Sequence, residues 1–589
     1  MALDGLVVAA LTHEFNSIVE FNRIEKIYQP QAGKIIIHLR LSGQNKKLLF
    51  SVKGNYPRVH FTDLKKENPA SPPNFCMVLR KHLLGGRIVA IQQANFDRII
   101  KFKIESRDEL SLIKETELII EMMGRHSNII LVNARDNTII DSIKRISVDI
   151  SRYRQVLPGL QYVMPPSRDK VNPLESNNSG DFANELLRFP QLPIKKALYY
   201  AFTGISPLIG REICYMANID GKILTNNLLD MELEKLYSAF SSIMDKIRTH
   251  RFTPSIYINR ENGDLIDFSI VPLSHLLPAN VKEFASTNEV IDDFYTKKDI
   301  NERLKQKIHT YRRIVNTNLE RLYKKLQNLH QDLSKAANPE EYKIMGDLIL
   351  ANLYQINRGD QFVELENFYQ EDQPIIKIKL DKRLTPSQNA QLYYKKYTRY
   401  KTASVKINKQ LIKSKAEIDY LEQILLAIEH SESLSDLTEL RHELIEGNYL
   451  RKTSKVKRAS NKRSANYRRF QSSEGLDILV GKNNRQNDEI TFKIANKEDL
   501  WFHAKDIPGS HVILRTNSKN YSDISILEAA QLAAYYSKGR NATKISIDYS
   551  KKENVRKPRG AKPGMVIYDN HSTLIVDASK ESIKNLCTP

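Results

Sequence analysis

A long pattern of apolar residues in the middle of the chain places the strongest constraint on the fold. From Lys297 onward these residues recur at alternating spacings of four and three, and one extra step of four breaks the phase as a stutter would. This pattern is typical of a helix in a coiled coil. The residues are Leu304, Ile308, Tyr311, Val315, Leu319, Leu322, Leu326, Leu329 and Leu333.

A second long helix is expected to pair with the first. The sequence TPSQNAQLYYKKY, from Thr385, predicts a return helix that runs to about His430. Between the helices, NPEE restarts a helix at Pro339, and VELENF and PIIKIKL suggest a small hairpin. A helix of about 40 residues is about 60 Å long, so we expect a reaching antiparallel arm, although an ordinary solvated helical hairpin fits the same pattern. An arm that pairs with itself favours a monomer.

The segments that flank the arm predict a multidomain α+β protein. Short β-rich runs fill the first 162 residues, and a helical segment follows in which Gly204 to Pro207 forms a turn like that of a helix-hairpin-helix. Ser206 stands where that motif has its second glycine, so a helix pair that only packs is an equal alternative. After the arm, alternating strands, one of them at EITFKI (489–494), and one helix predict an α/β domain. The expected domains are 1–175 (β-rich), 176–290 (helical), 291–446 (coiled coil), 447–469 (basic linker) and 470–589 (α/β).

The charge of the chain predicts a polyanionic partner. The 589 residues carry a formal net charge of +21, which favours nucleic acid first and an anionic membrane second. The linker and the loop KKENVRKPRGAKPG (551–564) are especially basic and suit phosphate contact. Trp501 could stack on a base, but a lone tryptophan in a strand-like run favours burial.

Motif searches favour a binding protein over an enzyme. The sequence has no Walker-type GxxxxGK[ST], no GxSxG and no HExxH. Cys76, Cys214 and Cys587 lie too far apart for a disulfide framework or a zinc site. We therefore expect no catalytic residues, no metal and no cofactor. The chain has no run of about 18 apolar residues and no signal-peptide pattern at its start, which predicts a cytoplasmic protein.

One short stretch, ANFDRIIKF (94–102), places two opposite charges side by side. We interpret the stretch as a β-strand, in which successive side chains point to opposite faces. Asp97 and Arg98 then cannot form a same-face pair, and one of them is expected to face inward or toward a ligand. The alternative is a structural network of ion pairs.

Several separate motifs together resemble the NFACT family, whose older name is the fibronectin-binding protein A family. The N-terminal motifs are FCMVLRKHLLGGRI (75–88), NFDRII (95–100), EMMGRHSNIIL (121–131) and LPGLQYVMPP (157–166). The return helix resembles the family's middle region, and GKNNRQNDEITFKIANKEDLWFHAKDIPGSHVIL resembles its C-terminal domain. The resemblance covers essentially the whole chain. It implies an N-terminal fold like that of formamidopyrimidine-DNA glycosylases, but Met1 to Asp4 offer neither the proline nor the glutamate of that chemistry.

The resemblance implies a ribosome-associated quality control factor. Members bind large ribosomal subunits blocked by peptidyl-tRNA and recruit tRNA, in bacteria tRNA-Ala, for mRNA-free tailing of the stalled chain, while the ribosome makes the peptide bond. The family's Asp-Arg pair matches Asp97 and Arg98, which implies tRNA binding. Weaker candidates for the same surface are Arg80, His82 and Arg125, and candidates for rRNA or tRNA backbone contact are Lys482, Lys505, Lys557 and Arg559.

Two other functions remain open from the sequence. The older family name motivates a fibronectin-binding surface adhesin, which would need export that no signal in the sequence provides. A general RNA chaperone also fits the charge, but such a protein would need neither the arm nor the NFDRII element.

Overall fold

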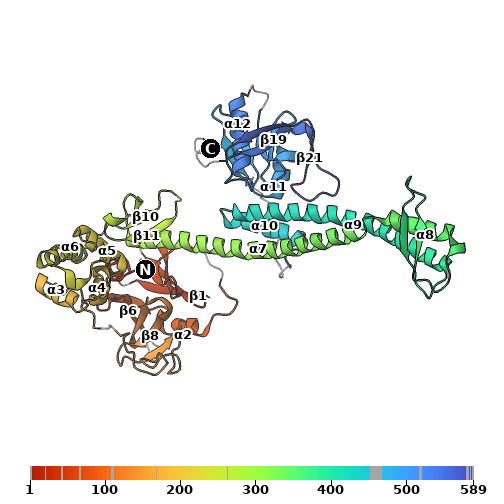
Figure 1. The fold of residues 1–589 in the computed structure, drawn as a ribbon. Coiled ribbons are helices and arrows are strands. Elements are labelled where there is room, and N and C mark those ends of the chain that lie inside the picture. The colour runs from red at the N-terminus through yellow and green to blue at the C-terminus, as the bar shows by residue number, and fades with distance from the viewer. Residues whose placement is uncertain are drawn as a thin grey trace. The chain divides into compact units, whose positions relative to one another are not determined.

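A computed structural model divides the chain into two compact units, residues 1–299 (unit 1) and 300–589 (unit 2). Figure 1 shows the ribbon. The structure describes residues 3–586 except 20–21, 42–43, 65–67, 108–111, 167–168, 262, 452–466, 517–520, 579–582 and 584–585. Most of the predicted basic linker therefore lies outside the described residues.

A nine-stranded sheet forms the first part of unit 1, with the order β4-β3-β2-β1-β5-β6-β7-β8-β9. All its described neighbouring pairs are antiparallel. The β-branched runs KIIIHLRL and IIKFKIESR make two of these strands, as their composition predicts. The strands are β1 (Arg23–Gln31), β2 (Lys34–Leu41), β3 (Gln44–Ser51), β4 (Arg58–Phe61), β5 (Arg87–Gln93), β6 (Ile99–Arg107), β7 (Ile113–Glu121), β8 (Asn128–Asn133) and β9 (Ile139–Ser142).

Two helices pack on this sheet through apolar faces. Helix α1 (Gly5–Val19) buries Leu6, Leu11 and Phe15, and α2 (Asn74–Leu83) buries Phe75 and Leu79. These side chains join the apolar side chains of the strands in one large core. The start of α1 is thereby fixed against the sheet.

The helical part of unit 1 contains the expected helix pair. Helices α4 (Ile194–Ala201) and α5 (Pro207–Met216) flank a turn in which Gly204 has a φ of 72°. Ser206 caps α5 by accepting a hydrogen bond from Ile209 N. The remaining elements are α3 (Ser179–Leu187), α6 (Asp230–Arg248), β10 (Ser255–Ile258), β11 (Leu265–Ser269) and β12 (Asn280–Glu283).

The predicted arm is present in unit 2, although its first helix begins within unit 1. Helix α7 (Thr287–Lys335) pairs with α9 (Pro386–Glu429), and the seam includes Val315 and Leu421. A helix that sequence analysis did not predict, α10 (Leu434–Glu446), adds its own apolar face to this core. Figure 1 shows α10 beside the two long helices.

The far end of the arm has a separate core. Helix α8 (Pro339–Ala351) and the predicted hairpin, β13 (Phe362–Glu366) with β14 (Ile375–Lys379), pack on the first turns of α9. Thr385 caps α9 in a capping box with Gln388, as TPSQ indicates. Between Tyr393 and Leu411, no residue of α9 is buried.

A six-stranded sheet and helix α12 (Asp523–Tyr535) form the C-terminal sheet domain. The predicted combination of strands and one helix is present, but all described strand pairs are antiparallel, so the domain is α+β and not α/β. The prediction of a strand at EITFKI is wrong, because α11 (Asn484–Glu489), capped by Asn483, leads directly into a π-helical turn, Ile490–Ile494. Trp501 is fully buried, as predicted. The strands are β15 (Arg468–Gln471), β16 (Asp477–Val480), β17 (Leu500–Ala504), β18 (Val512–Leu514), β19 (Ile545–Lys551) and β22 (Ser572–Val576), with β20 (Val555–Arg556) and β21 (Ile567–Tyr568) paired separately.

Candidate RNA interface

The Asp97–Arg98 pair lies in a turn between β5 and β6, so the predicted strand from Ala94 is wrong. Asn95 and Phe96 both have positive φ, 47° and 58°, which turns the chain sharply before β6 begins. Because the pair is not in a strand, its side chains can meet: Asp97 Oδ1 accepts from Arg98 N at 2.7 Å and lies 3.9 Å from Arg98 Nε. The Asp97 and Arg98 side chains are 24% and 27% exposed, so part of each faces solvent.

Close packing holds this turn in place. Phe96 is buried, and Gln93 Nε2 donates to the carbonyl oxygens of Gly5 and Asp97, each at 2.9 Å. A Cβ atom on Gly5 or Gly204 would approach Phe96 O more closely than 3.0 Å. The turn between β5 and β6 is therefore packed tightly against two segments, the start of α1 and the glycine turn between α4 and α5.

A buried carboxylate ties the same two segments together. Asp4 Oδ2 accepts from the Ser206 hydroxyl at 2.7 Å, and its Oδ1 accepts from Val7 N at 3.1 Å. Burial raises the pKa of Asp4 to about 6, while these hydrogen bonds oppose the shift. The serine in place of the motif's second glycine thus has a structural role.

The end of β7 lies beside the turn. Met122 N donates to Arg98 O at 2.8 Å. The preceding residue, Glu121, is buried and accepts from Arg154 Nη2 at 2.6 Å and from the Tyr162 hydroxyl at 2.9 Å. Burial raises the pKa of Glu121, and the Arg154 guanidinium opposes that shift. This network stabilises the end of β7 next to the turn, and sequence analysis did not identify it.

The weaker candidates for the same surface divide into two groups. Arg125 is exposed in the short helix that follows Met122, so the structure brings it to the same end of β7. Arg80 donates to Ile27 O and His82 contacts Lys114, at the opposite end of the β6–β7 hairpin. About seven residues of strand, roughly 23 Å, separate that end from Arg98.

Three of the four cationic candidates in unit 2 have acidic partners. Lys505 Nζ is 3.8 Å from Asp548, Lys557 contacts Asp488, and Lys482 Nζ is 3.2 Å from Asp436. Arg559 is exposed in the basic loop. Lys482 is only 16% exposed because it lies between the sheet domain and the arm.

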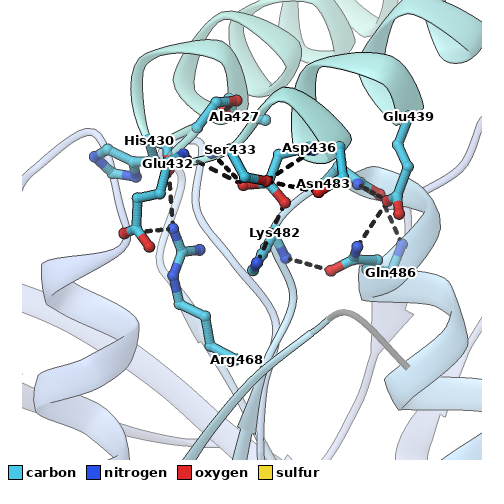
Figure 2. A network of polar contacts seen from close by, with 12 residues as sticks. Ala427, His430, Glu432, Ser433, Asp436, Glu439, Arg468, Lys482, Asn483 and Gln486 are labelled. Atoms are coloured by element: carbon cyan, nitrogen blue, oxygen red, sulfur yellow. Dashed lines mark hydrogen bonds and ion pairs between the residues drawn. The ribbon is translucent and has the colours of Figure 1, made fainter. Parts of the chain in front are cut away.

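The partner of Lys482 belongs to a row of acids that we name the acidic stripe. Each member contacts the segment 482–486 or Arg468 of the sheet domain, and Figure 2 shows much of this network. Arg468 meets Glu432 at 3.1 Å, Asn484 donates to Glu443 at 2.9 Å, and Arg485 pairs with Glu446. Glu439 accepts from Asn483 and Gln486. The stripe consists of Glu432, Asp436, Glu439, Glu443 and Glu446, whose 4-3-4-3 spacing is visible in the sequence.

Two family models match most of the chain. Residues 4–463 match the family described as NFACT N-terminal and middle domains, and residues 466–570 match the NFACT protein RNA binding domain. The chain is 38% identical over 587 residues to the Rqc2 homolog RqcH of Bacillus subtilis (strain 168), with all of both chains covered.

Solved structures show more distant similarity. The N-terminal part of the fibronectin/fibrinogen-binding protein from Streptococcus suis is 29% identical with a TM-score of 0.42, covering 50% of this chain and 99% of that one. A MutM (Fpg) protein from Thermus thermophilus is 12% identical with a TM-score of 0.23, covering 42% and 76%. The similarity to the glycosylase fold is therefore weak. No described helix is long and apolar enough to cross a membrane.

Proposed function

This chain belongs to the NFACT family, and on that premise we propose that it acts in ribosome-associated quality control. In this proposal it binds large ribosomal subunits that carry peptidyl-tRNA and recruits tRNA, specifically tRNA-Ala, for alanine tailing of the stalled chain. The observation that carries the proposal is the full-length similarity to a protein named Rqc2 homolog, together with the match to an RNA-binding domain.

We propose the turn Asn95–Arg98, the NFDR turn, as the tRNA-reading element. Arg98 offers a guanidinium to a phosphate or a base edge, and Asp97 offers carboxylate oxygens to base amino groups. A turn gripped by Gly5 and Gly204 presents these groups without a large loss of conformational freedom on binding. The ribosome supplies the peptidyl-transfer chemistry, so the chain needs to position tRNA rather than to react with it.

The experiment recovers the protein from cells and sequences the RNA that accompanies it. We expect large-subunit rRNA and one enriched tRNA. Arg98→Gln should reduce tRNA recovery about tenfold, equivalent to the loss of one hydrogen bond to a charged group of about 1.5 kcal/mol, while rRNA recovery stays constant. Arg107→Gln is the matched control, because Arg107 is exposed at the other end of β6.

Two outcomes would count against the proposal. Equal tRNA loss in the Arg98 and Arg107 variants would remove the role of the NFDR turn. Protein found at the cell surface without ribosomal RNA would favour the adhesin alternative.

A further inference from the structure

The sheet domain contacts the arm mainly through polar groups. The buried apolar clusters of the arm and of the sheet domain share no member among the described residues. Their described contacts include the acidic stripe with segment 482–486 and Arg468, and the pairs Lys538 with Glu422 and Lys562 with Glu417. Ring contacts are few: His430 lies edge-on to Tyr536, and Lys562 lies over the Tyr420 ring. A docked pair of domains usually buries a shared apolar centre, and this pair relies on charge.

The chemistry of the two faces is asymmetric. The arm contributes carboxylates, whereas the sheet domain contributes guanidinium, ammonium and amide groups. These are the side chains that contact phosphate oxygens in protein–nucleic acid complexes. Four of the five acids lie on α10, where side chains three and four residues apart have their Cβ atoms about 5–6 Å from one another. These four present a regular row of negative charge, as a nucleic-acid strand does.

The contacts on the sheet-domain side come from a nearly continuous piece of chain. Lys482, Asn483, Asn484, Arg485 and Gln486 all reach the stripe. Lys562, in the loop that sequence analysis predicts to contact RNA, also donates to Tyr449 of the arm at 2.8 Å. The arm therefore occupies part of the surface that the charge pattern assigns to RNA.

We propose that the face of the sheet domain around segment 482–486 binds RNA phosphates, and that the acidic stripe covers this face until RNA displaces it. The inference rests on the proposed function, because it takes the sheet domain to be the RNA-binding part of the chain. At the two ends of the stripe, Glu432 and Glu446 are 71% and 64% exposed, whereas the central pair of Lys482 with Asp436 is largely buried. Partly exposed ion pairs contribute little to stability and weaken with salt, so RNA, which offers many phosphates, can compete first at the ends of the stripe.

The first test neutralises the stripe in the full-length protein. The variant Glu432→Gln/Glu439→Gln/Glu446→Gln omits Glu443, which accepts from Tyr420 inside the arm, and Asp436, which takes part in the capping box of α10. Binding of a single-stranded oligouridylate, followed by fluorescence anisotropy, should tighten about three- to tenfold. This is the factor expected when a face is covered in roughly 70–90% of molecules.

A control variant removes the general effect of charge. Glu320→Gln/Glu366→Gln/Glu371→Gln changes the net charge by the same amount at exposed arm positions with no described contact to the sheet domain. Its affinity for the oligouridylate should rise much less than that of the stripe variant. Equal affinities in the two variants would overturn the inference.

The second test holds the docked state closed. Glu439→Cys and Gln486→Cys, in a Cys587→Ser background, place two thiols on opposite sides of the contact. In the native protein, Gln486 Nε2 donates to Glu439 Oε2 at 2.7 Å. A bismaleimide linker that contains a disulfide should lower RNA affinity, and reduction should restore it. Equal affinity before and after reduction would overturn the inference, whereas wild-type protein that binds neither RNA nor ribosomes would overturn the proposed function itself.

Discussion

The substitution Gly5→Ala tests whether the fixed position of the NFDR turn matters for tRNA. A Cβ atom at this position would lie closer than 3.0 Å to both Phe96 O and Gly204 Cα, and both are backbone atoms that cannot rotate away. The turn or the helix pair must therefore shift by several tenths of an ångström. Inserting a carbon into a packed core costs about 1–3 kcal/mol.

The expected cost is measurable by thermal unfolding. For a unit of this size each kcal/mol lowers the Tm by about 2–4 °C, so Gly5→Ala should lower the Tm of unit 1 by roughly 2–12 °C. Because Asp97 and Arg98 move with the turn, tRNA affinity should also fall at temperatures where the protein is fully folded. Circular dichroism gives the Tm, and filter binding with purified tRNA gives the affinity.

Gly33→Ala is the matched control. A Cβ atom at Gly33 would have its nearest neighbours at 3.7–3.8 Å, which is ordinary contact, and the residue lies outside the left-handed region. Its Tm and tRNA affinity should stay within experimental error or rise slightly. If Gly5→Ala and Gly33→Ala have the same Tm and the same tRNA affinity, the reasoning about the gripped turn is refuted.

Three further predictions concern the same two units. Burial raises the folded-state pKa of Asp4 to about 6, so the stabilising contribution of Asp4 is complete below about pH 4 and is lost as the pH rises through 6. Asp4→Asn should therefore raise the Tm at pH 7.5, and the Tm of this variant should fall less between pH 4 and pH 6 than the Tm of the wild type. Arg154→Leu leaves the Glu121 charge buried without its guanidinium partner and should cost about 3–5 kcal/mol in urea unfolding, an effect that an unchanged midpoint would contradict. Arg559→Gln should weaken RNA binding for all sequences alike and reduce the slope of log Kd against log salt by about 1, and an unchanged slope would show that Arg559 contacts no phosphate.

The arm could be predicted because its signal is local. Apolar spacing and the TPSQ and NPEE starts depend on residues a few positions apart, and the structure confirms the two long helices, the helix start at Pro339 and the small hairpin. Helix α10 has the same kind of spacing, but its apolar face is short, and sequence analysis did not predict it beyond the return helix that ends at about His430.

The NFDR turn could not be predicted because distant residues hold it. Nothing in ANFDRIIKF indicates a positive φ at Phe96, a conformation that bulky residues rarely adopt. The close approach of Phe96 O depends on the missing Cβ atoms of Gly5 and Gly204, which lie 91 and 108 residues away in the sequence. The β-branched run ITFKI misled for a similar reason, because the capping signal of Asn483 outweighed the strand propensity of the residues that follow.

The separation of the two arm cores has a mechanical consequence. From residue 394 to 410, α9 continues as a helix without burying a single side chain, and Val405 there is 68% exposed. Bending at this stretch would disturb little apolar packing, so the arm should be most compliant there while its two ends remain rigid. Amide hydrogen exchange should be faster at 394–410 than in either core, and the far end of the arm could tilt to meet a surface without any loss of structure at its base.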